Sequence, residues 1–274
     1  MTAAHGPRRR DLGALLALGG LGPGLLAGCS PGRVATSPDV PRDPLAELEA
    51  ELWDSRSAAD LLAQDVEGGD DLDLTAAREE LVRFVEAAYL SPETLRPLPD
   101  SEAYEHIRAA TPAYWEDNLQ DAWEASERLY YAHSPAEGFR TVGSPAISSS
   151  WFRREAEGTP LLLLGATIAW TAIETASRRV GVCAFRVGIR AELDADGAIP
   201  TASLRVTLHG MDLCAMQEGD GLTIPALGDD EAHVSAREET ARLVLASPRL
   251  GAEDLLDEES AVLEGDESTN VLCG

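Results

Sequence analysis

The chain has 274 residues, a length that corresponds to one or two domains. Hydrophobic residues make up 44% of it, enough for a folded core, which excludes a chain that is disordered throughout. The 48 acidic residues outnumber the 22 basic ones, all of them arginine, and the formal net charge is −26. Because phosphate backbones repel a protein this anionic, we expect no nucleic-acid partner.

The first 28 residues have the pattern of an export signal. Arg8, Arg9 and Arg10 precede an apolar stretch, Leu12 to Ala27, that is interrupted by glycines. This stretch is too short and too rich in glycine for a membrane-spanning helix, which needs about 20 predominantly apolar residues. We therefore predict that residues 1–28 are a signal peptide.

The end of this stretch, Leu26, Ala27, Gly28 and Cys29, resembles the lipobox of bacterial lipoproteins. The resemblance implies that the Cys29 thiol receives a diacylglycerol, that the signal is cut before Cys29, and that fatty acids such as palmitate hold the chain. The expected location is the extracytoplasmic face of the cell membrane. Arg9 and Arg10 also resemble the twin-arginine export motif, and ordinary secretory export remains open because Gly13 departs from that motif.

Charge divides the rest of the chain into three parts. Residues 30–74 hold twelve acids and three arginines, residues 75–215 hold twenty and thirteen, and residues 216–274 hold fifteen and three. The charge-dense ends predict flexible acidic flanks around a folded domain. We expect the lipidated cysteine, a proline-rich tether and a stalk helix in 29–74, the domain in 75–217, and an acidic tail with one helix in 218–274.

Apolar spacing predicts three helices and then four strands in this domain. The helices are expected over Thr75–Leu90, Ser101–Ala110 and from Thr111 to the residues before Pro135, and the aromatic residues of the third helix are expected in the core. The strands are expected over Thr141–Glu155, Pro160–Thr175, Arg178–Asp194 and Thr201–Gln217. The last two strands form a hairpin whose buried face carries odd-numbered residues of one strand and even-numbered residues of the other.

The hairpin turn is expected near residues 196–199, as an ordinary turn and not a calcium loop. The numbers of facing residues then sum to about 397, which places Ile189 opposite Leu208 and Cys183 opposite Cys214. Opposed residues of this kind lie within disulfide reach, so we predict a bond between these two cysteines, with two buried thiols as the alternative. Cys273 is then left free.

Few residues indicate chemistry. His106, His133, His209 and His233 have no partner at a metal-ligand spacing, and there is no nucleophile elbow or phosphate loop, so we expect neither a metal nor a cofactor. Asp212 is the one catalytic candidate. It is predicted on the inward face of the fourth strand, where a carboxylate is costly unless it is paired or lines a wet pocket. A bulge at Gly210 would instead turn Asp212 outward.

The order of helices and strands over residues 75–217 resembles the nuclear-transport-factor-2-like superfamily. This resemblance implies an α+β fold in which helices pack on a strongly curved, cone-like antiparallel sheet around an apolar pocket. Some members, such as ketosteroid isomerase and polyketide cyclases, use an inward acid as a base, and others only bind or scaffold.

The function expected from these observations is a lipid-anchored, exported protein whose α+β domain binds a small apolar ligand or an envelope protein without catalysis. One alternative is a pocket enzyme of the isomerase or dehydratase type that uses Asp212. The other is a structural envelope protein that acts through its acidic ends.

Overall fold

A five-stranded sheet in the order β1-β2-β3-β4-β5 forms the centre of the folded unit, which spans Pro41–Gly274. The structure, a computed structural model, describes residues 44–48, 52–69, 73–96, 98–246, 248–264 and 267–273. The strands are β1 (Val66–Glu67), β2 (Phe139–Ala156), β3 (Thr159–Glu174), β4 (Val180–Glu192) and β5 (Ala202–His209). The short strand β1 runs parallel to β2, and all other neighbours are antiparallel. The protein is therefore an α+β fold with a mixed sheet that is not strongly curled.

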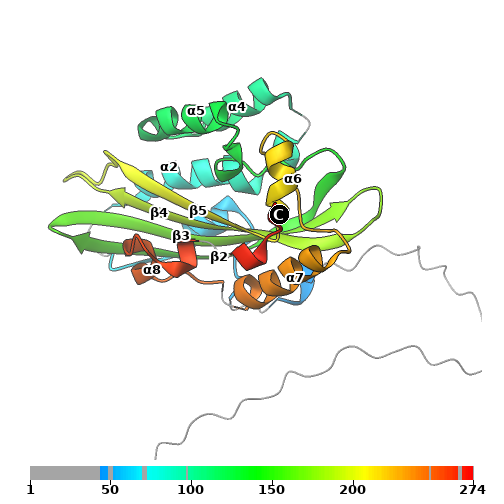
Figure 1. Cartoon of the computed structure of the whole chain (residues 1–274). Helices are drawn as coiled ribbons and strands as arrows, with labels where there is room; N and C mark the ends of the chain where they lie inside the picture. Colours follow the sequence, from blue (N-terminus) through cyan, green and yellow to red (C-terminus); the bar gives the residue numbers. More distant parts are fainter. Residues whose placement is uncertain are drawn as a thin grey trace, which may run out of the picture. The chain divides into compact units, whose positions relative to one another are not determined.

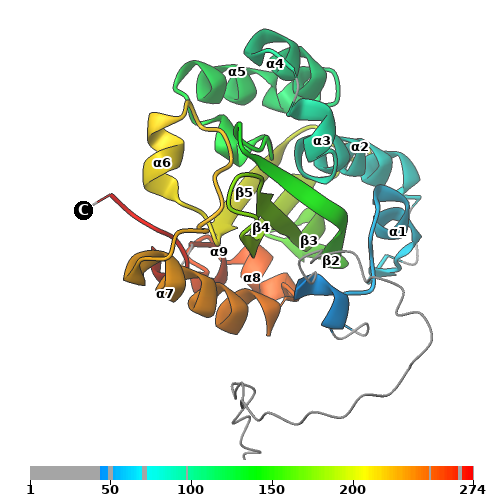
Figure 2. The same cartoon turned by 90° about the vertical axis from the view of Figure 1, so that its right-hand side faces the viewer.

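Helices cover both faces of this sheet (Figures 1 and 2). The first layer consists of α1 (Ala58–Ala63), α2 (Thr75–Val85), η2 (Glu86–Leu90), α3 (Pro92–Leu95), α4 (Asp100–Arg108), η3 (Ala113–Trp115), α5 (Glu116–Glu124), η4 (Arg128–Tyr130) and α6 (Leu213–Glu218). The other helical segments are η1 (Pro44–Glu47), α7 (Glu231–Thr240), η5 (Ala241–Leu245), α8 (Ala252–Leu256), α9 (Ala261–Glu264) and η6 (Glu267–Thr269), and the second layer is built mainly from them. None of the described helices is long and apolar enough to cross a bilayer.

Strand β3 explains why both layers are needed. Its even-numbered residues, such as Leu162 and Leu164, pack under the first layer, and its odd-numbered residues, such as Leu161 and Leu163, pack against the second. The cross-strand pair Gly165 and Gly188 lets the second layer approach closely, because an added Cβ would lie within 3 Å of leucine side chains there. The continuous apolar run of β3 is thus the consequence of burial on two faces.

The carboxyl-terminal third is part of the folded unit, which corrects the expectation of a flexible acidic flank beyond residue 217. Val244, Leu255 and Leu263 are buried against the sheet, while the acidic side chains of the same segments are mostly exposed. Apolar residues at the spacing of short helices bury one side of each helix, and acids occupy the other side. A high net charge of the segment therefore did not prevent it from folding.

The third predicted helix is interrupted. It divides into η3, α5 and η4, and Ser126 after α5 has a positive φ of 61° that ends the helix. The helix predicted over residues 75–90 is present as α2 and the wider turn η2. As expected for core aromatics, Trp115 is buried, and its indole donates a hydrogen bond to the backbone of β5.

The β4–β5 hairpin has the predicted faces but a different register. Ile189 faces Leu204, so facing residues sum to 393 and each pair is four residues away from the expected one. The turn is centred on Asp196 and Gly197, because Gly197 takes a positive φ and the Asp194 carboxylate accepts hydrogen bonds from the backbone of Asp196 and Ala198. This geometry is a side-chain-capped turn.

Strand β5 ends at His209, whereas the sequence predicted a strand through residue 217. Gly210 follows with φ of 73°, and a Cβ at this position would lie 2.3 Å from the carbonyl oxygen of Val182. Only glycine fits this turn. The chain then leaves the sheet and begins α6 at Leu213.

We predict that His133 makes folding stability sensitive to acid. Burial lowers the pKa of His133 to about 3, its ring packs against Trp170 and Phe185, and its Nδ1 has no hydrogen-bond partner among the described residues. In the unfolded chain His133 binds a proton near pH 6.5, whereas in the folded chain it does so only near pH 3, so its contribution to the free energy of unfolding is fully present above pH 6.5. The free energy of unfolding falls by up to about 1.4 kcal/mol per pH unit as the pH drops toward 3.

Chemical denaturation between pH 7 and pH 4 measures the free energy of unfolding at each pH. In His133→Phe this free energy should depend less on pH, because the part contributed by His133 is removed. The control Ile168→Val lowers stability at every pH without changing the slope, since it only removes a buried methyl group. An unchanged slope in His133→Phe would contradict the prediction.

Candidate functional site

The predicted residues of the export signal lie outside the described residues. These residues are Arg9, Arg10, Leu26, Ala27, Gly28 and Cys29. Lipidation at Cys29 therefore stays a prediction from the sequence. The other predicted positions, Asp212 and the cysteines Cys183 and Cys214, lie in or near the region where β5, α6 and the carboxyl-terminal segment meet.

Asp212 is the N-cap residue of α6. The prediction that it lies on the inward face of β5 is therefore wrong. Its Oδ1 accepts a hydrogen bond of 2.9 Å from the backbone N–H of Ala215. Its Oδ2 lies 3.2 Å from Nε2 of His233 on α7. The early end of β5 is the physical reason, because it places Asp212 at a helix start, where a carboxylate accepts the free backbone N–H groups.

His233 connects two carboxylates. Its Nδ1 lies 2.7 Å from Oδ2 of Asp230, the residue that begins α7, while its Nε2 faces Asp212. Both ring nitrogens therefore face carboxylate oxygens, and neither is left for a substrate in this arrangement. The hydrogen bond from His233 lowers the pKa of Asp230. The cluster fastens the start of α7 to the start of α6.

Cys214 is bonded to Cys273, which corrects the predicted pairing of Cys214 with Cys183. The two Cα atoms lie 4.8 Å apart and 59 residues apart in sequence. Cys183 stays on β4 as a buried thiol, and burial raises its pKa to about 12, which makes it unreactive. In the observed register, position 210 would face Cys183, and Cys214 has already left the sheet.

The carboxyl-terminal segment continues the sheet beyond β5. Thr269 accepts a backbone hydrogen bond from Gly210, and Val271 both donates to Met211 and accepts from Leu213. The buried Nδ1 of His209 lies 3.0 Å from the hydroxyl of Thr269. Cys273, two residues after Val271, forms the disulfide bond with Cys214. These contacts hold residues 269–273 in place along residues 208–214.

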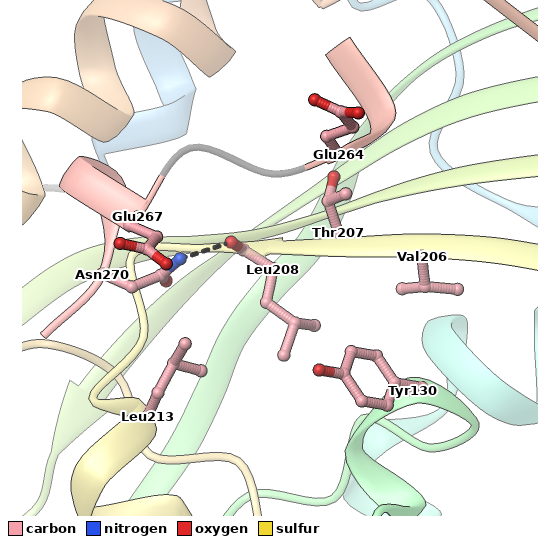
Figure 3. Close-up of a pocket in the computed structure, with 8 residues that line it drawn as sticks. All are labelled: Tyr130, Val206, Thr207, Leu208, Leu213, Glu264, Glu267 and Asn270. Carbon is pink, nitrogen blue, oxygen red and sulfur yellow. Dashed lines mark hydrogen bonds between the residues drawn. The ribbon is translucent and has the colours of Figure 1, made fainter. Parts of the chain in front are cut away.

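Beside this segment lies a cavity of about 140 Å³ along the outer edge of β5 (Figure 3). Val206 and Leu208 point toward Tyr130 and Leu213 of the first layer, while Thr207 points the other way (Figure 3). Glu264 lies on the side to which Thr207 points, and Glu267 lies beside Asn270; both glutamates line the cavity and are exposed (Figure 3). Small-molecule pockets usually measure about 300 Å³ or more, so this cavity has room for a side chain and not for a whole metabolite.

The described residues hold no group of three or more His, Cys, Asp or Glu side chains arranged to bind a metal ion. Sequence reasoning missed the residues of the cavity because they come from four segments far apart in the chain. Asn270, one of two asparagines in the protein, was the one available signal. Its side chain donates to the carbonyl of Leu208 and accepts from the N–H of Met211, roles that need an amide.

Comparisons of the chain with protein-family models, with curated proteins and with solved structures found no match.

We predict that the bond between Cys214 and Cys273 is a main source of stability. The chain-entropy model assigns about 4 kcal/mol to a loop of this length, and Cys273→Ser should lower the free energy of unfolding by up to that amount. Urea denaturation measures it, with Cys183→Ala as the control that leaves the bond intact. A linked peptide containing Cys183 in the non-reduced protein would contradict the assignment.

We predict that Asp212 and His233 are coupled energetically. A double-mutant cycle of Asp212→Ala and His233→Ala should give a coupling energy of about 1 kcal/mol, because both side chains are mostly buried and in contact. The control cycle pairs Asp212→Ala with Arg242→Ala, whose exposed side chain pairs with Glu239 and not with Asp212. Additive effects in the first cycle would show that the contact contributes nothing.

Proposed function

We propose that the protein is anchored by lipid at Cys29 on the extracytoplasmic face of the cell membrane and binds a partner protein there without catalysing a reaction. The observation that carries the proposal is the disulfide between Cys214 and Cys273 in a chain that begins with a lipobox-like signal. Disulfides persist outside the cytoplasm and are rare inside it. The folded domain and the signal thus favour the same compartment.

The spacer and the charge support this location. Residues 30–43 lie between the expected lipid site and the first described element and contain three prolines, a composition typical of a tether. Without the signal, the chain carries 47 acids and 19 arginines. Anionic lipids repel such a domain, so a partner has access to its surface.

The packing of the interior supports a binding role at the surface. Large buried side chains fill the space between the first helical layer and the sheet, among them Phe84, Tyr89, Trp115 and Phe185. This filled core disfavours the small apolar ligand as an occupant. Asp212 is used for helix capping and for the contact with His233, which removes the residue on which the enzyme alternative depended.

A relationship to the nuclear-transport-factor-2-like superfamily, with its cone-like sheet, stays a prediction from the order of elements. The order of helices followed by the antiparallel strands β2 to β5 supports it. The second helical layer is an addition that the predicted cone did not include.

We predict that Cys29→Ala releases the protein from the membrane or leaves the precursor uncleaved. Two acyl chains anchor a protein stably, and the variant loses the thiol that carries them. Cell fractionation and labelling with radioactive palmitate measure the effect, with Cys183→Ala as the control that keeps the label. An unlabelled wild type, together with unchanged membrane partition of Cys29→Ala, would contradict the proposal.

A further inference from the structure

Strand β5 is the last strand of the sheet, and its backbone shows which groups face outward. The N–H of Glu192 on β4 donates to the carbonyl of Thr201, so the odd-numbered residues of β5 direct their backbone groups toward β4. Backbone direction alternates along a strand of an antiparallel pair. The residues that direct their N–H and C=O away from the sheet are therefore Ala202, Leu204, Val206 and Leu208.

Both ends of this outer edge are covered. The Trp115 indole donates to the carbonyl of Ala202, and the Asn270 amide donates to the carbonyl of Leu208. Between these ends, two residues have outward N–H and C=O groups without a hydrogen bond to any other described residue: Leu204 and Val206. An open strand edge of this kind is a template for another strand.

The residues that line the cavity along this edge differ in chemistry. One part of the cavity lining is apolar, formed by Tyr130, which is 43% exposed, together with Val206 and Leu213. Glu264 and Glu267, at α9 and η6, line the same cavity and have no ion pair within the described part of the chain (Figure 3). The nearby Arg205 does not neutralise them, because its guanidinium donates to backbone carbonyls such as those of Asp254 and Asp257.

We propose that the open edge of β5 binds an extended segment of the partner protein as a sixth strand, and that this segment alternates apolar and basic residues. Main-chain hydrogen bonds to Leu204 and Val206 would give affinity, and alternate side chains would enter the apolar cavity or pair with Glu264 and Glu267. This inference rests on the proposed function and names the site and the chemistry of its partner.

The negative charge of this chain disfavours a second copy as the occupant of the β5 edge. Edge-to-edge pairing of two β5 strands would bring two sets of Glu264 and Glu267 together in a protein whose net charge is −26. Like charges held this close cost free energy, whereas a basic segment removes the repulsion.

The test measures binding of a fluorescein-labelled peptide, acetyl-Val-Arg-Val-Lys-Val-Arg-Val-amide, to the full chain in nonionic detergent by fluorescence anisotropy. We expect saturable binding that weakens with salt. The same peptide with glutamate in place of its basic residues, and the same peptide N-methylated at alternate residues, should not bind. Loss of binding on N-methylation indicates strand pairing, because the methyl group removes only backbone donors.

Val206→Pro is the decisive variant. It removes an outward N–H but no hydrogen bond to β4, so an edge strand tolerates it. It should weaken peptide binding by about tenfold or more, because it also blocks close approach of the added strand. Val206→Thr keeps the N–H and the β-branched shape, so it should bind the peptide more tightly than Val206→Pro. Circular dichroism confirms that both variants are folded.

The acidic side is tested with Glu264→Gln combined with Glu267→Gln, which should weaken binding about fivefold at low salt. Glu253→Gln combined with Glu259→Gln, exposed residues that do not line the cavity, should leave it unchanged. Absence of binding, or equal binding by Val206→Pro and Val206→Thr, would overturn the inference. So would a dimer of the wild type that Val206→Pro separates, because the occupant would then be a second copy.

These outcomes are separate from those of the Cys29 experiment. Peptide binding by a chain that is not lipidated would retain the edge site and overturn the membrane location. A lipidated chain that does not bind the peptide would overturn the edge site alone.

Discussion

Burial of β3 on both faces is the constraint on which the rest of the structure depends. A strand with leucine at four successive positions cannot leave either face in water, so the sheet requires helices on both sides. Helices that precede β2, together with α6, cover one face, and most of the helices after α6 cover the other. The acidic carboxyl-terminal third is therefore part of the fold although its charge is typical of a flexible segment.

The end of β5 is the second constraint, and it organises the candidate site. Gly210 turns the chain against the carbonyl of Val182, and the next residues begin α6. The outer edge beyond this turn is occupied by residues 269–271 and fastened by the bond between Cys214 and Cys273. Before the turn, the outward backbone groups of Leu204 and Val206 have no hydrogen bond to another described residue. The turn at Gly210 thus separates the part of the edge that residues 269–271 cover from the part at Leu204 and Val206.

The proposed binding function depends on this division of the β5 edge into a covered part and a part that another strand can pair with. In our proposal the interaction is at the surface, because large side chains fill the described space between the first helical layer and the sheet and the Asp212 carboxylate contacts Ala215 and His233. A strand edge supplies affinity through backbone groups, which any extended segment can satisfy, so specificity depends on the side chains on either side. Here those are apolar residues and two glutamates that line one cavity, in a strongly acidic chain.

The sequence by itself determined the α+β class, the strands β2 to β4, the buried face of the β4–β5 hairpin and the resemblance to a lipoprotein signal, because these depend on local spacing and composition. It did not determine the hairpin register, the disulfide partner of Cys214 or the position of Asp212. The register depends on the turn at Asp196 and Gly197, which the Asp194 carboxylate caps. The positions of Cys214 and Asp212 depend on where β5 ends, at the close contact between Gly210 and Val182. The sites at the β5 edge, at Tyr130, Glu264, Glu267 and Asn270, depend on segments far apart in the chain, which only tertiary packing brings together.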